Sequence, residues 1–385
     1  MADQASKARI LWITSLAAPY RIPVWKALAD WADFEVALTE PDDDVGGSSS
    51  INRGSDWRST AYPEVRFTAL RTIRIRWRGR PRYFLRLRSG LRSMRNLDAV
   101  LVGGWDTPAY WQVLALTKLC GVRTVAFYES TPASHRFDRG PIAGARRLFF
   151  NHVDAIVVPG VAARDGLIGM GLPPERIHTG FNAVDVQRFH EIATQHRRRH
   201  TTNADGHRFI YVGQLIRRKR VDRVIEAFRA IADGYDSLTI VGEGKEQPHI
   251  SALIRNLNIE SQVKLIPGVL NADVPDILSD HHTLVLASDE EVWGLVSNEA
   301  LACGLHVVVS KNCGVAASIE NMRGVHTAET NSLEDLASAM TASRNSWSGP
   351  IDNPEILQHT PEQFADVFYD ALSDGMNQWR YQHSP

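Results

Sequence analysis

Two glutamates on either side of a glycine form the segment best suited to chemistry, and seven residues separate them. Glu291 falls in the loop after an expected strand, and Glu299 lies about one turn inside the helix that follows. The residues between them would offer N–H groups at a helix N-terminus, a natural anion site, and these are Gly294, Leu295 and Val296. A diphosphate could bind there, with Glu299 on ribose hydroxyls and Glu291 on sugar hydroxyls. The alternative is that the acids cap a helix, and the spacing alone favours capping.

A basic turn could supply the positive charge that a bound diphosphate needs. Arg217, Arg218 and Lys219 follow an apolar strand and precede an amphipathic helix. Gly213, at the end of that strand, would let the backbone approach a phosphate. Basic runs are usually solvated loops, but the place of this one between strand and helix favours a functional role for Lys219.

A second pair of glycines ends the next strand, where Gly242 and Gly244 flank Glu243. Such a pair more often forms a tight turn than a ligand site. Its place at the carboxyl end of a strand nevertheless puts it near the expected ligand site. The acidic triplet at 42–44 lies in a loop rich in Gly and Ser, so we expect a solvated loop and no metal site.

The first half of the chain offers candidates for binding an acceptor at three strand ends. Arg21 follows the first strand and would either meet an anionic acceptor or lie on the surface. Trp105 ends a later strand and would stack on a sugar or pack in the core. Tyr128 and Glu129 end the strand after that, where a carboxylate facing a cleft favours a catalytic, hydroxyl-binding role for Glu129. His135 is a candidate proton shuttle.

Short apolar strands alternate with helical segments along the chain, which is typical of an α/β fold with parallel sheets covered on both faces. The pattern occurs twice, so we expect two Rossmann-like, doubly wound domains facing a cleft, with ligands at the carboxyl ends of the strands. The expected boundaries are a first domain at 1–188, a polar linker at 189–207, a second domain at 208–360 and a C-terminal helix at 361–385 packing back toward the first domain.

The glutamate segment resembles the E-x7-E signature of retaining GT-B glycosyltransferases of the fourth family, the glycosyl transferases group 1. Its usual form is E-x-F-G-x-x-x-x-E-A-x-A-x-G, and this chain departs only at Trp293, where Phe is common. Four further segments resemble family motifs in the same order. They are G-F-N-A-V-D ending at Asp185, Y-V-G-Q-L-I-R-R-K-R-V-D ending at Asp222, V-G-E-G ending at Gly244 and P-G-V at 267–269.

The resemblance implies the GT-B fold and transfer of a sugar from a UDP- or GDP-type donor to a glycan or lipid-linked acceptor. It also implies a retained anomeric configuration and no metal or other cofactor, because Lys219 and a guanidinium neutralise the departing diphosphate. The family often has Arg where this chain has Gln214, so Arg217 or Arg218 is expected to substitute. The expected catalytic residues are Glu291, Lys219 and Glu129, and the expected donor-binding residues are Gly213, Arg217, Arg218, Lys219, Gly242, Glu243, Val269, Glu291, Gly294, Leu295, Val296 and Glu299.

Three other functions remain open at this point. A nucleotide-sugar epimerase or a sugar phosphorylase would share the GT-B architecture, although no additional phosphate or cofactor lysine site is evident for a phosphorylase. A non-catalytic protein that binds membranes or nucleic acid is the alternative from another class. The presence of Glu291, Glu299 and Lys219 favours the transferase.

Residues 66–95 contain eleven arginines and no acidic residue, with aromatic side chains interleaved. Such runs usually form a solvated face, and a solvated helix face is the alternative here. The density of cations favours an anionic membrane surface. Nucleic acid is disfavoured, because the whole chain has a formal net charge of −1 and no recognition motif.

The overall composition bounds the class of protein. With 44% hydrophobic and 23% charged residues, the chain is typical of a globular protein. Three scattered cysteines are too few for a disulfide framework. The start does not resemble a signal peptide and no stretch is long enough to span a bilayer. We therefore expect a cytoplasmic protein that residues 66–95 would hold at the inner face of the membrane.

Overall fold

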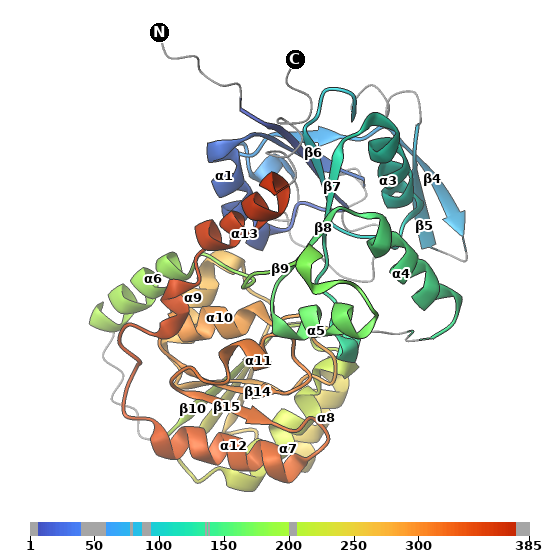
Figure 1. Ribbon diagram of the computed structural model, residues 1–385. Coiled ribbons are helices and arrows are strands. Elements are labelled where there is room, and N and C mark those ends of the chain that lie inside the picture. Colours follow the sequence, from blue (N-terminus) through green and yellow to red (C-terminus); the bar gives the residue numbers. More distant parts are fainter. Residues whose placement is uncertain are drawn as a thin grey trace.

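The structure is a computed structural model that describes residues 7–39, 59–77, 80–86, 94–134, 137, 139–199 and 206–374. The chain forms two α/β units that lie against each other, one drawn in blue to green and the other in yellow to orange (Figure 1). Each unit has a parallel sheet between layers of helices, as expected for the GT-B fold. No helix in the described ranges is both long and apolar enough to cross a bilayer.

The first unit is built on a seven-stranded sheet with the order β3-β2-β1-β6-β7-β8-β9. Its strands are β1 (Arg9–Thr14), β2 (Asp33–Leu38), β3 (Phe67–Ala69), β6 (Ala99–Val102), β7 (Arg123–Phe127), β8 (Ala155–Val158) and β9 (Ile177–Thr179). The helices beside it are α1 (Ile22–Trp31), α3 (Pro108–Cys120), α4 (Pro141–His152) and α5 (Val161–Gly169). The central strands are continuous apolar runs such as Ala-Val-Leu-Val, because helices cover both of their faces.

The second unit has a six-stranded sheet with the order β12-β11-β10-β13-β14-β15. Its strands are β10 (Arg208–Val212), β11 (Ser237–Val241), β12 (Val263–Ile266), β13 (Thr283–Leu286), β14 (His306–Ser310) and β15 (Val325–Ala328). The helices are α7 (Val221–Ile231), α8 (Gln247–Asn256), α9 (Val274–Ser279), α10 (Leu295–Ala302), α11 (Ala316–Ile319) and α12 (Leu333–Ser346). The strand order reverses between β10 and β13, so a crevice is expected outside their carboxyl ends.

The stretch that we expected to be a linker is largely helical. Helix α6 (Val186–Arg199) covers most of it, and only residues 200–205 lie outside the described part. Phe189 and Ala193 are buried on the side of α6 that packs against α9 and α10. The few apolar side chains of this basic segment are spaced as on one face of a helix. Sequence reasoning missed this amphipathic helix because most of its residues are polar.

The C-terminal helix crosses back to the first unit, as predicted. Helix α13 (Pro361–Ser373), drawn in red in Figure 1, lies beside α1 and presents Phe364 and Phe368 to the first sheet. The ring centroids of Phe368 and Trp12 are 4.8 Å apart. The Arg123 guanidinium donates two hydrogen bonds to the carbonyl of Ala371, at 2.8 and 3.0 Å.

The arginine-rich segment contains a β-hairpin, so the helix face that we considered for it is wrong in the described part. Strands β4 (Thr72–Trp77) and β5 (Arg80–Leu85) pair antiparallel as a separate two-stranded sheet beside α3. The sequence T-I-R-I-R-W alternates with period two, which favours a strand over a helix.

Candidate functional site

An ion pair joins the loops on either side of the crevice in the second unit. Lys219 ends a single 3-10 turn (Arg217–Lys219) after β10, and Glu291 lies in the loop after β13. The Lys219 ammonium donates a hydrogen bond to the Glu291 carboxylate, and each side chain is 13% exposed. Burial lowers the pKa of Lys219 to about 8, and the nearby Arg218 guanidinium lowers it as well. The nearby Cys313 thiol acts in the opposite direction and raises it.

Helix α10 begins beside this pair without a side-chain cap. Its N-cap is Gly294, with φ 107°, and a Cβ atom there would lie 2.9 Å from a methyl group of Leu286. The N–H groups of Leu295 and Val296 at the first turn are therefore suited to an anionic ligand. The sequence prediction of an anion site at this helix is thus compatible with its geometry.

Glu299 lies one turn inside α10 in a desolvated position. Burial raises the pKa of Glu299 to about 7. Within the part of the chain that the structure describes, no residue donates a hydrogen bond to its carboxylate. Although the residue as a whole is half-buried, a carboxylate that is largely desolvated and has no donor is costly when it is ionised. The hydroxyl groups of a ligand would supply the missing donors. A carboxylate that capped the helix would instead accept hydrogen bonds from its N–H groups.

The strand-end glycines allow two loops to touch through their backbones. A Cβ atom at Gly242 would lie only 1.9 Å from the carbonyl oxygen of Gly213, and one at Gly244 only 2.1 Å from that of Leu215. Gly242 and Gly244 therefore have a packing role, which was not expected from the sequence, and donor binding at Gly242 stays a prediction. Glu243 is exposed and Val269 is half-buried at the same edge of the sheet.

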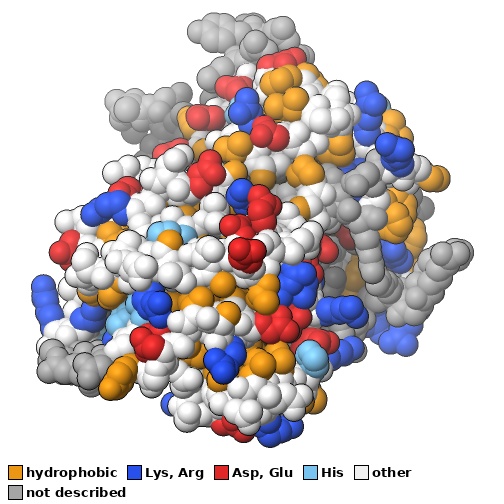
Figure 2. Space-filling view, turned by 90° about the horizontal axis from the view of Figure 1, so that it is seen from below, with side chains coloured by type: hydrophobic (Ala, Val, Ile, Leu, Met, Phe, Trp, Pro, Cys, Tyr) orange, Lys and Arg blue, Asp and Glu red, His pale blue; other side chains and the backbone are white. Residues whose placement is uncertain are grey.

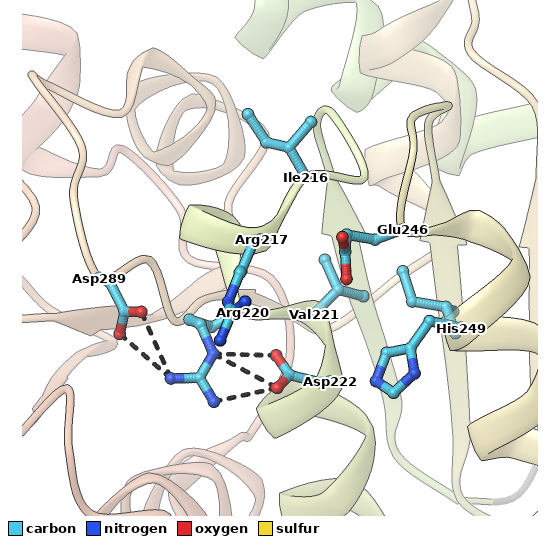
Figure 3. Close-up of a pocket in the computed structure, with 9 residues that line it drawn as sticks. Ile216, Arg217, Arg220, Val221, Asp222, Glu246, His249 and Asp289 are labelled. Carbon is cyan, nitrogen blue, oxygen red and sulfur yellow. Dashed lines mark hydrogen bonds and ion pairs between the residues drawn. The ribbon is translucent and has the colours of Figure 1, made fainter.

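The structure separates the two arginines that we could not distinguish. Arg218 lies beside Lys219 and donates a 2.7 Å hydrogen bond to the carbonyl of Glu290. Arg217 instead lines another cavity of about 440 Å³ and points toward Arg220 (Figure 3). These contacts favour Arg218 over Arg217 as the partner of Lys219, and the role of either arginine in donor binding stays a prediction.

Arg220 is a residue that the sequence did not single out. It has a left-handed backbone conformation, with φ 51°, and its guanidinium forms ion pairs with Asp222 and Asp289 (Figure 3). The resembled family has glycine after the motif lysine, and a left-handed residue explains that preference. The sequence signal that could have singled out Arg220 was an arginine at a position where the family motif has glycine.

A second ion pair lies on the first unit, where Arg21 follows β1 and Glu129 follows β7. The two side chains are 11% and 24% exposed. The guanidinium carbon of Arg21 also lies 4.8 Å from the centre of the Phe127 ring. Glu129 accepts a further, longer hydrogen bond of 3.4 Å from the Asn182 amide. Both carboxylate oxygens of Glu129 are therefore held by protein donors.

The two units are joined directly behind these residues. The Asn298 side chain, in α10, donates a 2.7 Å hydrogen bond to the carbonyl of Asn182 and accepts one of 3.2 Å from the Trp293 indole. The Trp293 ring packs edge-on against Phe181, and a Cβ atom at Gly160 would lie 2.5 Å from it. Trp293 thus belongs to the interface between the units. Sequence reasoning missed Asn182 and Asn298 because neither has a charge.

The remaining acceptor candidates are placed differently from one another. Tyr128 is 3% exposed and packs on Phe150 in the first core, so its expected contact with an acceptor is not supported. Trp105 is half-buried, with the Arg146 guanidinium 5.3 Å from its ring centre. His135 lies outside the described residues, as does the acidic triplet at 42–44. Within the described ranges, no group of three or more His, Cys, Asp or Glu side chains could hold a metal ion.

Both halves of the chain match models of known protein families. Residues 51–188 match the model described as Glycosyltransferase Family 4, and residues 193–345 match the one described as Glycosyl transferases group 1. An N-acetyl-alpha-D-glucosaminyl L-malate synthase of Bacillus anthracis is 30% identical over 221 residues, which are 53% of this chain and 56% of that protein. The lipopolysaccharide glucosyltransferase WaaG of Escherichia coli is 30% identical over 42% of this chain and 46% of its own.

The chain thus spans about half the length of the curated relatives that it matches. Similarity of structure extends further. A crystal structure of HepE from Anabaena in complex with UDP matches 97% of this chain and 98% of that chain, with a TM-score of 0.68 at 14% identity. At that identity the likeness shows a shared fold. The fold is therefore that of the GT-B glycosyltransferases, and the two halves of the chain are similar to Glycosyltransferase Family 4 and to the glycosyl transferases group 1.

Proposed function

We propose that this protein transfers a sugar from a UDP- or GDP-type donor to a glycan or lipid-linked acceptor, with retention of configuration and without a metal ion. The observation that carries the proposal is the Lys219–Glu291 pair beside the uncapped start of α10. The similar crystal structure contains UDP, and two curated relatives have names that specify transfer of glucose or N-acetylglucosamine.

Each charged group of the site has a role when a donor binds. The Lys219 ammonium exchanges the Glu291 carboxylate for the diphosphate, together with Arg218 and the first N–H groups of α10. Glu291 is then available for sugar hydroxyls, and Glu299 accepts hydrogen bonds from the ribose. Negative charge grows on the diphosphate as the glycosidic bond breaks, and fixed cations stabilise it.

The state of Glu129 supports transfer on the same face of the sugar. Its two oxygens accept hydrogen bonds from Arg21 and Asn182, which favours a role in holding a hydroxyl group over attack on the sugar in a double displacement. The departing diphosphate would then assist the incoming hydroxyl. A catalytic role of Glu129 in holding a hydroxyl group stays a prediction.

Donor binding and turnover test the proposal. Calorimetry with UDP and with GDP in the presence of EDTA should show binding of one of them. Lys219→Met should weaken that binding by at least tenfold, because a charged hydrogen bond contributes ~1.5–3 kcal/mol. Lys245→Met, which removes an exposed lysine, is the control. Dependence of turnover on Mg²⁺ or Mn²⁺, or an inverted product by NMR, would contradict the proposal.

A further inference from the structure

We propose that the β4–β5 hairpin docks this protein on an anionic lipid surface. The exposed isoleucines of β4 would enter the headgroup region, while arginines of the same strand and of the hairpin ends bind lipid phosphates. The proposal rests on the proposed function in one respect, because a membrane surface would present a lipid-linked acceptor. The docking itself depends on the hairpin alone and can be tested without a donor.

The outer face of the hairpin exposes apolar side chains. Ile73 and Ile75 alternate along β4, so they share one face, and each is 48% exposed. Phe84 is paired directly opposite Ile73 in the antiparallel register and is half-buried. The hairpin is a separate two-stranded sheet. Clustered exposed apolar side chains usually mark a binding surface.

The inner face anchors the hairpin rigidly to the first unit. Tyr83 and Leu85, at 2% and 4% exposed, belong to the described core. The Gln112 side chain, on α3, accepts a 2.7 Å hydrogen bond from the N–H of Leu85 and donates one of 3.3 Å to its carbonyl. The apolar face therefore cannot turn inward. The hairpin itself stands at the outer flank of the first unit beside α3 (Figure 1).

Positive charge lies on the same strand and at the ends of the hairpin. Arg74 and Arg76 alternate with Ile73 and Ile75 along β4, so their side chains leave the strand on its other face, where Arg74 is paired with Tyr83. Four arginines of the hairpin and its ends are exposed, and they are Arg71, Arg74, Arg76 and Arg86. The whole stretch of 66–95 lacks an acidic residue. In contrast, acidic and basic side chains are interspersed over the underside of the second unit (Figure 2). The chain is nearly neutral overall, so its basic charge is concentrated locally in this segment.

Exposed isoleucines beside arginines favour an anionic lipid surface over a soluble polyanion. Nucleic acid or an acidic glycan would be bound by the arginines but would not cover the isoleucine pair. A lipid surface accommodates both, because guanidinium groups remain at headgroup level while apolar side chains enter the acyl boundary. Association of two copies through the isoleucines would bring the arginines of both hairpins together, and like charges oppose this.

Sedimentation with vesicles tests the docking. Vesicles of phosphatidylglycerol and phosphatidylcholine should bind the protein at 0.1 M salt, and pure phosphatidylcholine vesicles should not. Arg74→Ser with Arg76→Ser should weaken binding about 30-fold, since each arginine near an anionic surface contributes ~1 kcal/mol. Ile73→Ser with Ile75→Ser should weaken it about tenfold. Raising the salt to 1 M should release much of the wild-type protein.

Matched variants separate local from general effects. Arg198→Ser with Arg199→Ser removes two exposed arginines at the end of α6, and Leu119→Ser removes a side chain that is 78% exposed. Both should bind vesicles like wild type. Binding unaffected by the isoleucine variant, a dimer dissolved by it, or oligonucleotides that compete fully with vesicles would overturn the proposal.

The donor reaction provides the independent readout. The hairpin variants should bind UDP or GDP with wild-type affinity, since they leave the second unit unchanged. Loss of vesicle binding with intact donor binding therefore concerns docking alone. A wild-type protein that binds anionic vesicles but neither nucleotide would contradict the proposed function and leave the docking intact.

Discussion

The amide of Asn298 reaches across the two units and donates a 2.7 Å hydrogen bond to the main-chain carbonyl of Asn182. Asn298 is 0% exposed and Asn182 is 4% exposed, so water does not compete for the bond. Asn182 in turn contacts Glu129, and Asn298 precedes Glu299 in α10. One buried contact thus connects the Arg21–Glu129 ion pair with α10, the helix that we propose binds the donor.

Asn298→Ala should therefore affect both stability and transfer. It leaves the buried carbonyl of Asn182 without its donor, which costs ~1–3 kcal/mol. We expect a Tm several degrees lower and a fall in kcat/KM for transfer, with nucleotide affinity changed little. Asn345→Ala, at an exposed position, is the control. A Tm equal to that of wild type would show that the bond contributes nothing.

Glu299→Gln should weaken nucleotide binding and raise the stability of the protein at alkaline pH. The ribose hydroxyls lose a charged acceptor, so nucleotide affinity should fall by about one to two orders of magnitude. Burial raises the pKa of Glu299 to about 7, so ionising it at pH 8 opposes folding. The variant should therefore be clearly more stable than wild type at pH 8, and the difference should be much smaller at pH 5, where folded Glu299 is neutral and the pH is only slightly above the ordinary pKa of 4.5.

Urea unfolding and calorimetry at the two pH values measure both effects. Glu260→Gln, at an exposed glutamate of the second unit, should change neither quantity. Unchanged nucleotide binding in the Glu299 variant would assign this residue to capping α10.

Donor binding should be tightest between about pH 7 and pH 8. Lys219 has a pKa lowered to about 8 by burial, so the free protein loses this cation above that pH. Glu299, with a pKa raised to about 7 by burial, loses its negative charge below that pH. The nucleotide Kd should rise on both sides. In Lys219→Arg the alkaline rise should vanish, because a guanidinium stays protonated. A Kd that is flat from pH 6 to pH 9 would contradict these assignments.

The second unit should lose stability in acid through histidines at the far end of its sheet. Burial lowers the pKa of His207 and of His282 to about 3, and His282 stacks on Trp347 at 4.8 Å. The unfolded chain binds these protons near pH 6.5, so stability is complete above that pH and declines as pH falls toward 3. Each site contributes about 1.4 kcal/mol per pH unit in that range.

His282→Asn should reduce this slope. The Asn side chain can still accept the hydrogen bond that the His282 ring accepts from the N–H of Arg208, but it does not titrate. Urea unfolding followed by tryptophan fluorescence at pH 7, 6 and 5 measures the slope. His152→Asn, at an exposed histidine of the first unit, should leave it unchanged. Equal slopes in all three proteins would exclude His282 as a source of acid sensitivity.

The sequence by itself determined the α/β class, the doubled pattern of strands and helices, and the segments of Lys219 and Glu291. These follow from local signals, namely apolar runs of strand length, helical periodicity and short motifs at strand ends. The parallel order then brings residues distant in sequence to one edge, so the sequence predicted that Lys219 and Glu291 would share a site.

Tertiary structure decided what local patterns could not. Arg217 and Arg218 are neighbours in the sequence, and only the turn that holds them directs one toward Lys219 and the other into a separate cavity. Tyr128 follows a strand like Glu129, but its side chain packs on the opposite side, in the core. Whether alternate side chains of a strand end face a cleft or a core depends on which helices cover each face. That is set by contacts between segments far apart in the chain, such as the bond from Asn298 to Asn182.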